Sequence, residues 1–232
     1  DTQAQQLTLE PYDQASKSYK IEADVNEDNF RINENYSIAD PTVQEKKELM
    51  ERAKGEFLLL QNIRNEGWYK ALPGYGLLVW RIDYSDIDKV HLTDSPNNTI
   101  GIPRVTIVPA DGLVINQANI GADQYWESCW NDPFPAYKIG KDGSDINSLT
   151  EVKFNWSTMT TRPLYNIAKD EATGIVSFDY LKDFKATGIE NTLLDKDASS
   201  TPTEYFDLEG RKITTPLKGH LYITNKGKKV IY

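Results

Sequence analysis

The clearest pattern in the chain is a pair of short apolar runs separated by a loop rich in glycine and proline. The runs are Phe57–Leu60 and Leu77–Ile82, and the loop between them contains Gly67, Pro73 and Gly74. Apolar runs of this length, bounded by glycine and proline, are typical of buried strands. The sequence therefore predicts two paired strands at the centre of a sheet.

Other runs with strand composition occur before and after this pair. Val152–Trp156 alternates apolar and polar residues, as a half-buried strand does. We predict a mainly β architecture over residues 1–185, a twisted antiparallel sheet or β-sandwich. The remaining predicted strands of this region are Leu7–Leu9, Tyr19–Ile21, Val105–Val108, Leu164–Ile167 and Ile175–Tyr180.

One helix is predicted before the first central strand. Asp40 is a suitable N-cap, Pro41 suits the first helical position, and Gly55 stands where a helix C-terminus favours glycine. The apolar residues between them form a thin stripe, so this should be an inserted surface helix.

The composition changes near residue 185. Asp195–Thr203 contains no apolar residue larger than alanine, which is typical of a linker. We therefore predict a linker over residues 186–203 and a small C-terminal β-meander over residues 204–232.

Composition and charge limit the function. The 232 residues include 26 basic and 35 acidic side chains and carry a formal charge of −9, which argues against nucleic-acid binding. No apolar stretch approaches the roughly 20 residues needed to cross a bilayer. Cys129 is the only cysteine, so no internal disulfide forms. The chain begins at Asp1 without a charged and apolar leader; if it is exported, the leader was removed or lies upstream.

The amino-acid sequence of the central segment resembles that of a known family. Glu56–Asp83 contains Glu-Phe-Leu-Leu-Leu-Gln-Asn and Gly-Leu-Leu-Val-Trp-Arg-Ile-Asp. It is similar to the segment that follows the zinc-binding helix of immune inhibitor A-type secreted metalloproteases. The likeness covers roughly residues 8–181 and returns at Val105–Gly112, at Asp132–Pro135 and at the pair formed by 165–167 and 175–180.

The chain departs from the family pattern in the central segment and nearby. Gln61 stands where the family tends to have glutamate, and Arg81 stands where it usually has histidine after Trp80. Any metal or substrate contact of that glutamate or histidine is therefore in doubt here. The other departures are Ile63, Arg64 and Ala136.

The C-terminal tail follows a separate pattern. It runs from Tyr205-Phe206-Asp207 to Lys229-Val230-Ile231 and is similar to sorting or anchoring modules of exported Bacteroidota proteins. Together the two resemblances imply a secreted or cell-surface protein.

Zinc hydrolysis requires ligands that this chain does not supply in the usual pattern. The common arrangement places two histidines at i and i+4 with a neighbouring glutamate. The chain has only His91 and His220, and neither belongs to a His-Glu-x-x-His motif. The resemblance therefore implies the non-catalytic C-terminal half of a zinc metallopeptidase, with zinc in the missing half, and the chain is not expected to be active alone.

In such an enzyme this half would buttress the zinc-bearing N-terminal half and line the cleft that receives a protein or peptide substrate. The candidate interface or cleft-wall residues flank the best-matched strands. They are Glu56, Arg64, Trp80, Arg81 and Asp83.

Other chemistry is less well marked. Calcium prefers oxygen ligands in irregular loops, and four aspartates gather in one such region. Cys129 as a nucleophile would need a neighbouring imidazole, and a free cysteine is more often a small buried hydrophobe. The candidate calcium ligands are Asp123, Asp132, Asp142 and Asp145.

The stretch Gly121–Tyr137 is aromatic and predicted to be irregular. Trp126 and Trp130 could stack on sugar rings, but we expect them, with Phe134, to anchor a long loop on the sheet. Three further tryptophans are most simply explained as core residues: Trp68, Trp80 and Trp156.

Two alternatives to the metallopeptidase half remain open. The chain could be a stand-alone exported module that binds glycan or protein through the aromatic stretch. It could also be an inactive protease relative, an alternative that the departures at Gln61 and Arg81 keep open.

Overall fold

The computed structural model describes residues 3–36, 40–85, 96–114, 121–137, 144–185, 204–206, 211–214, 221–224 and 229–231. The chain divides into two compact units, Asp1–Lys182 and Asp183–Tyr232. The division lies three residues before the predicted domain boundary, and the predicted linker 186–203 lies outside the described residues.

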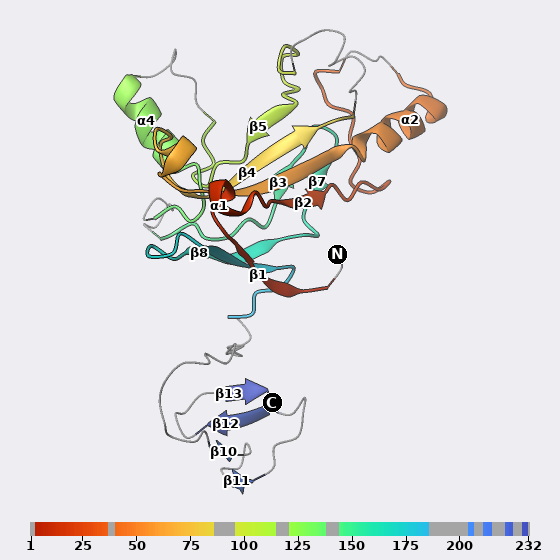
Figure 1. The fold of residues 1–232 in the computed structure, drawn as a ribbon. Helices are drawn as coiled ribbons and strands as arrows, with labels where there is room; N and C mark the ends of the chain where they lie inside the picture. Colours follow the sequence, from red (N-terminus) through yellow and green to blue (C-terminus); the bar gives the residue numbers. More distant parts are fainter. Residues whose placement is uncertain are drawn as a thin grey trace. The chain divides into compact units, whose positions relative to one another are not determined.

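The first unit is built on two antiparallel sheets (Figure 1). One has the order β2-β3-β4-β5, with β2 at Tyr19–Glu22, β3 at Glu56–Ile63, β4 at Gly76–Asp83 and β5 at Val105–Ile107. The other has the order β1-β9-β8, with β1 at Gln5–Leu9, β8 at Leu164–Lys169 and β9 at Val176–Tyr180. A short pair, β6 (Val152–Lys153) and β7 (Thr158–Met159), completes the strands.

The two sheets share one apolar core. Side chains of β3 alternate between buried and half-buried, so that Leu58 and Leu60 are fully buried. They join Val176 and Phe178 of the other sheet in a single cluster, and Tyr19 packs edge-on against Phe178. This face-to-face packing confirms the predicted mainly β fold of antiparallel sheets.

The described residues contain three α-helices instead of the single one predicted, α1 (Tyr12–Ala15), α2 (Val43–Ala53) and α4 (Ala122–Trp130). The predicted surface helix is α2, but its N-cap is Thr42 and not Asp40. The Thr42 hydroxyl accepts from the Glu45 amide, and the Glu45 carboxylate accepts from the Thr42 amide. This reciprocal capping box satisfies two amides that the first helical turn leaves free.

The aromatic stretch is partly helical, so the prediction of an irregular segment over Gly121–Tyr137 is wrong for α4. Trp126 is 48% exposed and Trp130 57% exposed, so neither is buried as the anchor role required. Phe134, which follows the helix, is 2% exposed and does join the core.

The other three tryptophans differ in burial. Trp156 is 2% exposed, as expected for the core, and Trp80 is half-buried. Trp68 is 94% exposed in the short 3-10 helix η1 (Gly67–Tyr69), so its prediction as a core residue is wrong.

Asn62 near the end of β3 links the two sheets. Its side-chain amide donates to the Leu9 carbonyl oxygen at 2.7 Å and to the Gly174 carbonyl oxygen at 2.8 Å. Leu9 ends β1, and Gly174 lies in the turn between β8 and β9. One buried carboxamide therefore connects β3 to the edge strand β1 and to the turn between β8 and β9 of the facing sheet.

Replacing Asn62 with alanine should lower the free energy of unfolding by about 2 kcal/mol, because two carbonyl groups lose their donor in a buried site. Urea denaturation followed by tryptophan fluorescence measures the loss. Gln44→Ala on the exposed face of α2 is the control and should change stability by less than about 0.5 kcal/mol. An Asn62 variant as stable as that control would show that the link is not needed.

The second unit contains a four-stranded antiparallel sheet of order β11-β10-β12-β13. Its strands are β10 (Tyr205–Phe206), β11 (Lys212–Ile213), β12 (Leu221–Thr224) and β13 (Lys229–Ile231). The rings of Tyr205 and Tyr222 pack edge to face with centroids 6.1 Å apart. No helix among the described residues of either unit has the length and apolar character needed to cross a membrane.

Candidate functional site

Two carboxyl groups meet at one end of the central strand pair. Glu56 begins β3 and Asp83 ends β4, and the antiparallel register places them directly opposite each other. Glu56 is fully buried and Asp83 is 3% exposed. Buried carboxyl groups require donors, and these two take theirs from distant segments of the chain.

Glu56 is held by the loop after β6. Its Oε1 accepts from the Asn155 backbone amide at 2.7 Å, and its Oε2 accepts from the Trp156 backbone amide at 3.1 Å. Burial, with the neighbouring Asp83 adding to it and the two amide bonds opposing it, raises the pKa of Glu56 from its ordinary 4.5 to about 8. A proton is therefore retained on this side chain at neutral pH.

Asp83 receives more donors than Glu56. Its Oδ2 accepts from Asn155 Nδ2 at 2.7 Å and from Trp156 Nε1 at 3.2 Å, and it lies 3.5 Å from an Arg104 guanidinium nitrogen. Its Oδ1 accepts from the Ser85 backbone amide at 2.8 Å. These bonds fasten three separated segments around one carboxylate.

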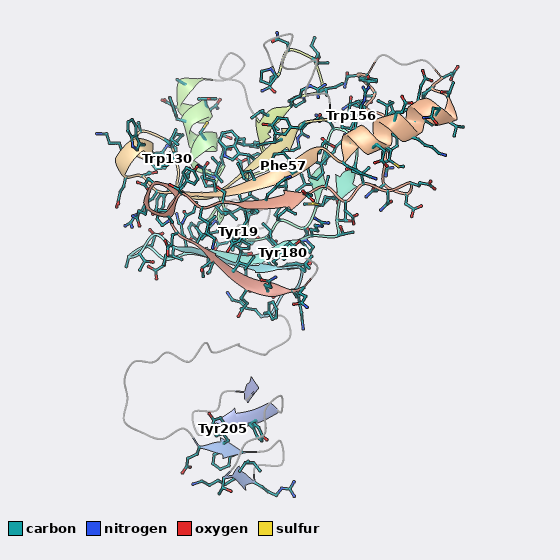
Figure 2. The ribbon with its side chains drawn as sticks, turned by 45° about the vertical axis from the view of Figure 1, so that its right-hand side comes forward. Tyr19, Phe57, Trp130, Trp156, Tyr180 and Tyr205 are labelled. Atoms are coloured by element: carbon teal, nitrogen blue, oxygen red, sulfur yellow. The ribbon has the colours of Figure 1, made fainter. Side chains whose placement is uncertain are left out.

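Figure 2 shows Trp156 and Phe57 labelled among the side chains of the first unit. The Trp156 indole also donates to the Ser85 hydroxyl at 2.9 Å, and its ring packs edge-on against Tyr36. Trp156 is thus both an apolar core residue and a hydrogen-bond donor to the carboxyl cluster.

A hollow of about 480 Å³ lies beside this cluster. Arg81 of β4 and Asn155 line it, together with the segment 31–35, with Gly101 and Pro103, and with residues of the strand pair β6–β7. Arg81 is held in place because it donates to the Lys153 carbonyl oxygen at 2.8 Å and to the Pro103 carbonyl oxygen at 3.2 Å. Burial lowers the pKa of Arg81, while Glu56 and Asp83 oppose that change.

The candidate interface or cleft-wall residues occupy different surroundings. Glu56 and Asp83 are buried with all their described contacts inside the unit, so they could influence an interface only through the segments they position. Arg81 lines the hollow. Trp80 Nε1 donates to Gln61 Oε1 at 3.1 Å, and Arg64 donates to the Thr173 carbonyl oxygen at 3.1 Å.

Gln61, one of the departures from the family pattern, has a defined role in this sheet. Its oxygen accepts from Trp80 and its amide donates to the Tyr69 hydroxyl at 3.1 Å. A glutamate here could accept from Trp80 but could not donate to Tyr69 without a proton. The side chain therefore links β3, β4 and η1.

The candidate calcium ligands are only partly described. Asp142 lies outside the described residues, Asp123 is exposed in the first turn of α4, and Asp132 follows that helix. Burial, with Asp111 adding to it, raises the pKa of Asp132 to about 7. Within the described ranges, no group of three or more His, Cys, Asp or Glu side chains is placed to hold a metal ion. Calcium therefore stays a prediction.

The remaining sequence candidates do not form a reaction centre in the described part of the chain. Burial, with Asp132 adding to it, raises the pKa of the Cys129 thiol, which disfavours the thiolate that a nucleophile needs. His91 and His220 lie outside the described residues.

Sequence reasoning did not connect Arg104, Asn155 or Trp156 with the carboxyl cluster. Trp156 is predicted as a core residue at the end of the strand Val152–Trp156, and Asn155 stands at a polar position of that strand, whereas Arg104 comes from a loop without a periodic pattern. A signal was present in the run Asn155-Trp156-Ser157, where a polar residue stands on each side of a large aromatic. All three residues are buried.

Comparison with known proteins adds no relative to this picture, since the chain matches no family model, no curated protein and no solved structure.

Proposed function

We propose that the chain is the non-catalytic β-rich portion of a secreted zinc metallopeptidase of the immune inhibitor A type. In this proposal it buttresses a zinc-bearing half and contributes to the wall of the cleft that receives a peptide. The main support comes from buried polar residues in β3 and β4, the two strands on which the resemblance depends. Glu56, Asn62 and Asp83 are all buried and all fasten distant segments of the unit.

This use of polar residues is that of a scaffold. Buried carboxyl and carboxamide groups are costly unless they are well paired, and here each is paired with backbone or side chains from another element. Such pairing fixes where loops leave the sheet. A fixed loop end is what a supporting half would offer to a neighbouring catalytic half.

An exposed apolar surface supplies the candidate contact with the zinc-bearing half. It is formed by Trp68 in η1, Leu72 after it, and Trp126 and Trp130 in α4, all of which are at least 43% exposed. Both views place η1 beside α4, and Figure 2 labels Trp130 there. Exposed aromatic side chains on neighbouring elements are typical of interaction sites.

The first test is an assay of the full-length gene product. Casein cleavage should be abolished by a chelator and restored by zinc, whereas the 232-residue chain alone should cleave nothing under the same conditions. A gene product that carries a His-Glu-x-x-His helix upstream of Asp1 but leaves casein intact with zinc would support the inactive relative. A gene product without that helix would overturn the metallopeptidase proposal.

The second test addresses the apolar surface. The double variant Trp68→Ser/Trp126→Ser should weaken association with the separately expressed zinc-bearing half by tenfold or more, because aromatic residues dominate such contacts. Val43→Ser is the matched control, since Val43 is 73% exposed at the start of α2, at the other end of the sheet in Figure 1. Equal loss in both variants, or in neither, would contradict this docking surface.

A second candidate function follows from the same exposed tryptophans. A stand-alone glycan-binding module would use Trp126 and Trp130 to stack on sugar rings. In that case a glycan array would show binding by the 232-residue chain that Trp126→Ser removes. Binding of this kind without any association with a zinc-bearing half would favour the module over the scaffold.

A further inference from the structure

The hollow beside the carboxyl cluster has a charge opposite to that of the chain. Three of its lining residues are cationic, Arg31, Arg81 and Lys153, and one is acidic, Glu34. The chain as a whole carries a formal charge of −9. A local excess of positive charge in an acidic protein favours an anionic ligand at that place.

These cations form no ion pair with a carboxylate of the described chain. Among the described residues, no carboxylate oxygen lies within ion-pair distance of Arg31, Arg81 or Lys153. Glu56 and Asp83 influence Arg81 only through the longer-range field. The positive charge of the hollow is therefore available to a ligand.

Arg81 is fixed but keeps unused donors. Two of its nitrogens each donate to a backbone carbonyl, of Lys153 and Pro103, which holds the guanidinium plane in one orientation. A guanidinium has five N–H donors, so hydrogen-bonding capacity remains. Its Nε is buried and has no hydrogen-bond partner within the described part of the chain.

The lining of the hollow is polar and internally supported. Asn33 Nδ2 donates to the Asn155 carbonyl oxygen at 3.2 Å, which joins the two walls. Asn155 is in turn held by Glu56 and Asp83. Ser157, a further lining residue, is 5% exposed, and its hydroxyl has no partner in the described ranges. Such a hollow exists before any ligand arrives, which lowers the entropic cost of binding.

We infer that this hollow binds a small organic carboxylate that also carries amide or hydroxyl groups, with its carboxylate facing Arg81 between Arg31 and Lys153. A planar guanidinium fits a carboxylate in two-point contact. The carboxylate of Glu34 and the amide of Asn35 provide partners for the remaining polar groups of the ligand, whereas Asn33 already donates to the Gly101 and Asn155 carbonyl oxygens. A volume of about 480 Å³ suits a small molecule. The inference concerns this chain alone and does not depend on the proposed function.

The chemistry has two ordinary sources, a peptide C-terminus and a sugar acid, and the test separates them. Isothermal titration on the 232-residue chain uses N-acetyl-glycyl-glycine against its C-terminal amide, and glucuronate against glucose. At least one carboxylate should bind, and its neutral counterpart should bind at least tenfold more weakly. Inorganic phosphate is included in the same series.

Variants assign any binding to the hollow. Arg31→Gln and Lys153→Gln change exposed side chains that make no hydrogen bond or ion pair with the described residues. Each variant should therefore fold and weaken carboxylate binding about threefold, and the double variant about tenfold. Arg81→Gln should remove binding, with thermal unfolding measured to show that the fold is retained. Lys17→Gln, an exposed lysine after α1, is the matched control and should bind as the unchanged chain does.

Three results would overturn the inference. The first is equal binding of carboxylates and their neutral counterparts. The second is phosphate binding as tight as that of the best carboxylate, which would mark a general anion site. The third is unchanged affinity in the Arg31→Gln/Lys153→Gln double variant, which folds independently of the ties made by Arg81.

Discussion

Replacing Asp83 with alanine should lower the free energy of unfolding of the first unit by about 3–5 kcal/mol, because it removes one buried charge that several buried donors share. The Arg104 side chain would lose the charge 3.5 Å away, and the Asn155 and Trp156 side chains would lose an acceptor. A buried donor left without an acceptor destabilises the fold by its full desolvation free energy. This is the largest single-residue effect expected from the structure.

Urea denaturation followed by tryptophan fluorescence measures this loss. All five tryptophans of the chain belong to the first unit, so the signal reports on that unit alone. Glu27→Ala, which removes an exposed carboxylate without a described bond, is the control and should stay within about 0.5 kcal/mol of the unchanged chain. An Asp83→Ala variant that loses less than about 1 kcal/mol would show that the cluster contributes little to stability.

The second large effect is a dependence of stability on pH that originates at Glu56. Burial, with Asp83 adding to it, gives this side chain a pKa of about 8 in the folded chain against an ordinary 4.5. Between these values the folded state holds a proton that the unfolded state has released. The free energy of unfolding should therefore fall as pH rises from about 4.5 to about 8 and level off above, by up to about 5 kcal/mol.

In the Glu56→Gln variant the free energy of unfolding should depend less steeply on pH. The variant and the unchanged chain are compared by this slope and not by their absolute stabilities. The glutamine amide places a donor against one of two backbone amides, so the variant loses one hydrogen bond at every pH. Asp132, whose pKa is raised to about 7, contributes a slope of the same sign. Asp132→Asn therefore serves as the parallel variant. Urea unfolding at pH 5, 6, 7 and 8 separates them, and identical slopes in Glu56→Gln and the unchanged chain would refute the assignment.

The sheet was accessible to sequence reasoning because its signal is local. The runs around Leu58 and Leu77 are apolar, short and bounded by glycine and proline, and each forms a strand of the predicted type. The helix before them also had local signals, but two capping residues competed. The proline at position 41 favoured Asp40, whereas the Thr42–Glu45 spacing is that of a capping box and determines the start.

The aromatic residues misled because size alone does not fix burial. Gly67, at the start of η1, has a φ of +55°. The side chain of Trp68, which follows it, lies outside the core. In α4 the apolar residues do recur at helical spacing, at positions 122, 125, 126, 129 and 130. Ser128 is nevertheless the only buried residue of that helix, so this stripe is not part of the buried core. Prolines nearby strengthened the impression of a loop.

The candidate site could be predicted only in part. Glu56 and Asp83 were chosen because they flank the best-matched strands, but their partners are separated from them in the chain. Asn155 and Trp156 lie 99 and 100 residues after Glu56. Arg81 was chosen for the same reason, and only the folded chain shows that it meets Arg31 and Lys153 around one hollow. Which distant residues come together depends on the topology of the sheets, and a single sequence does not show that topology.

Asn155 belongs to both the carboxyl cluster and the wall of the hollow, and this double membership limits local motion. Its side chain spans Asp83 and the Pro103 carbonyl, while its carbonyl receives Asn33. The segment 153–157 cannot move away by itself, because Glu56 and Asp83 would then lose hydrogen-bond donors and the hollow would lose one of its walls. Opening this segment should therefore require nearly the free energy of unfolding the whole unit. Its backbone amides should exchange with solvent as slowly as those of the core strands, although much of the segment is a loop.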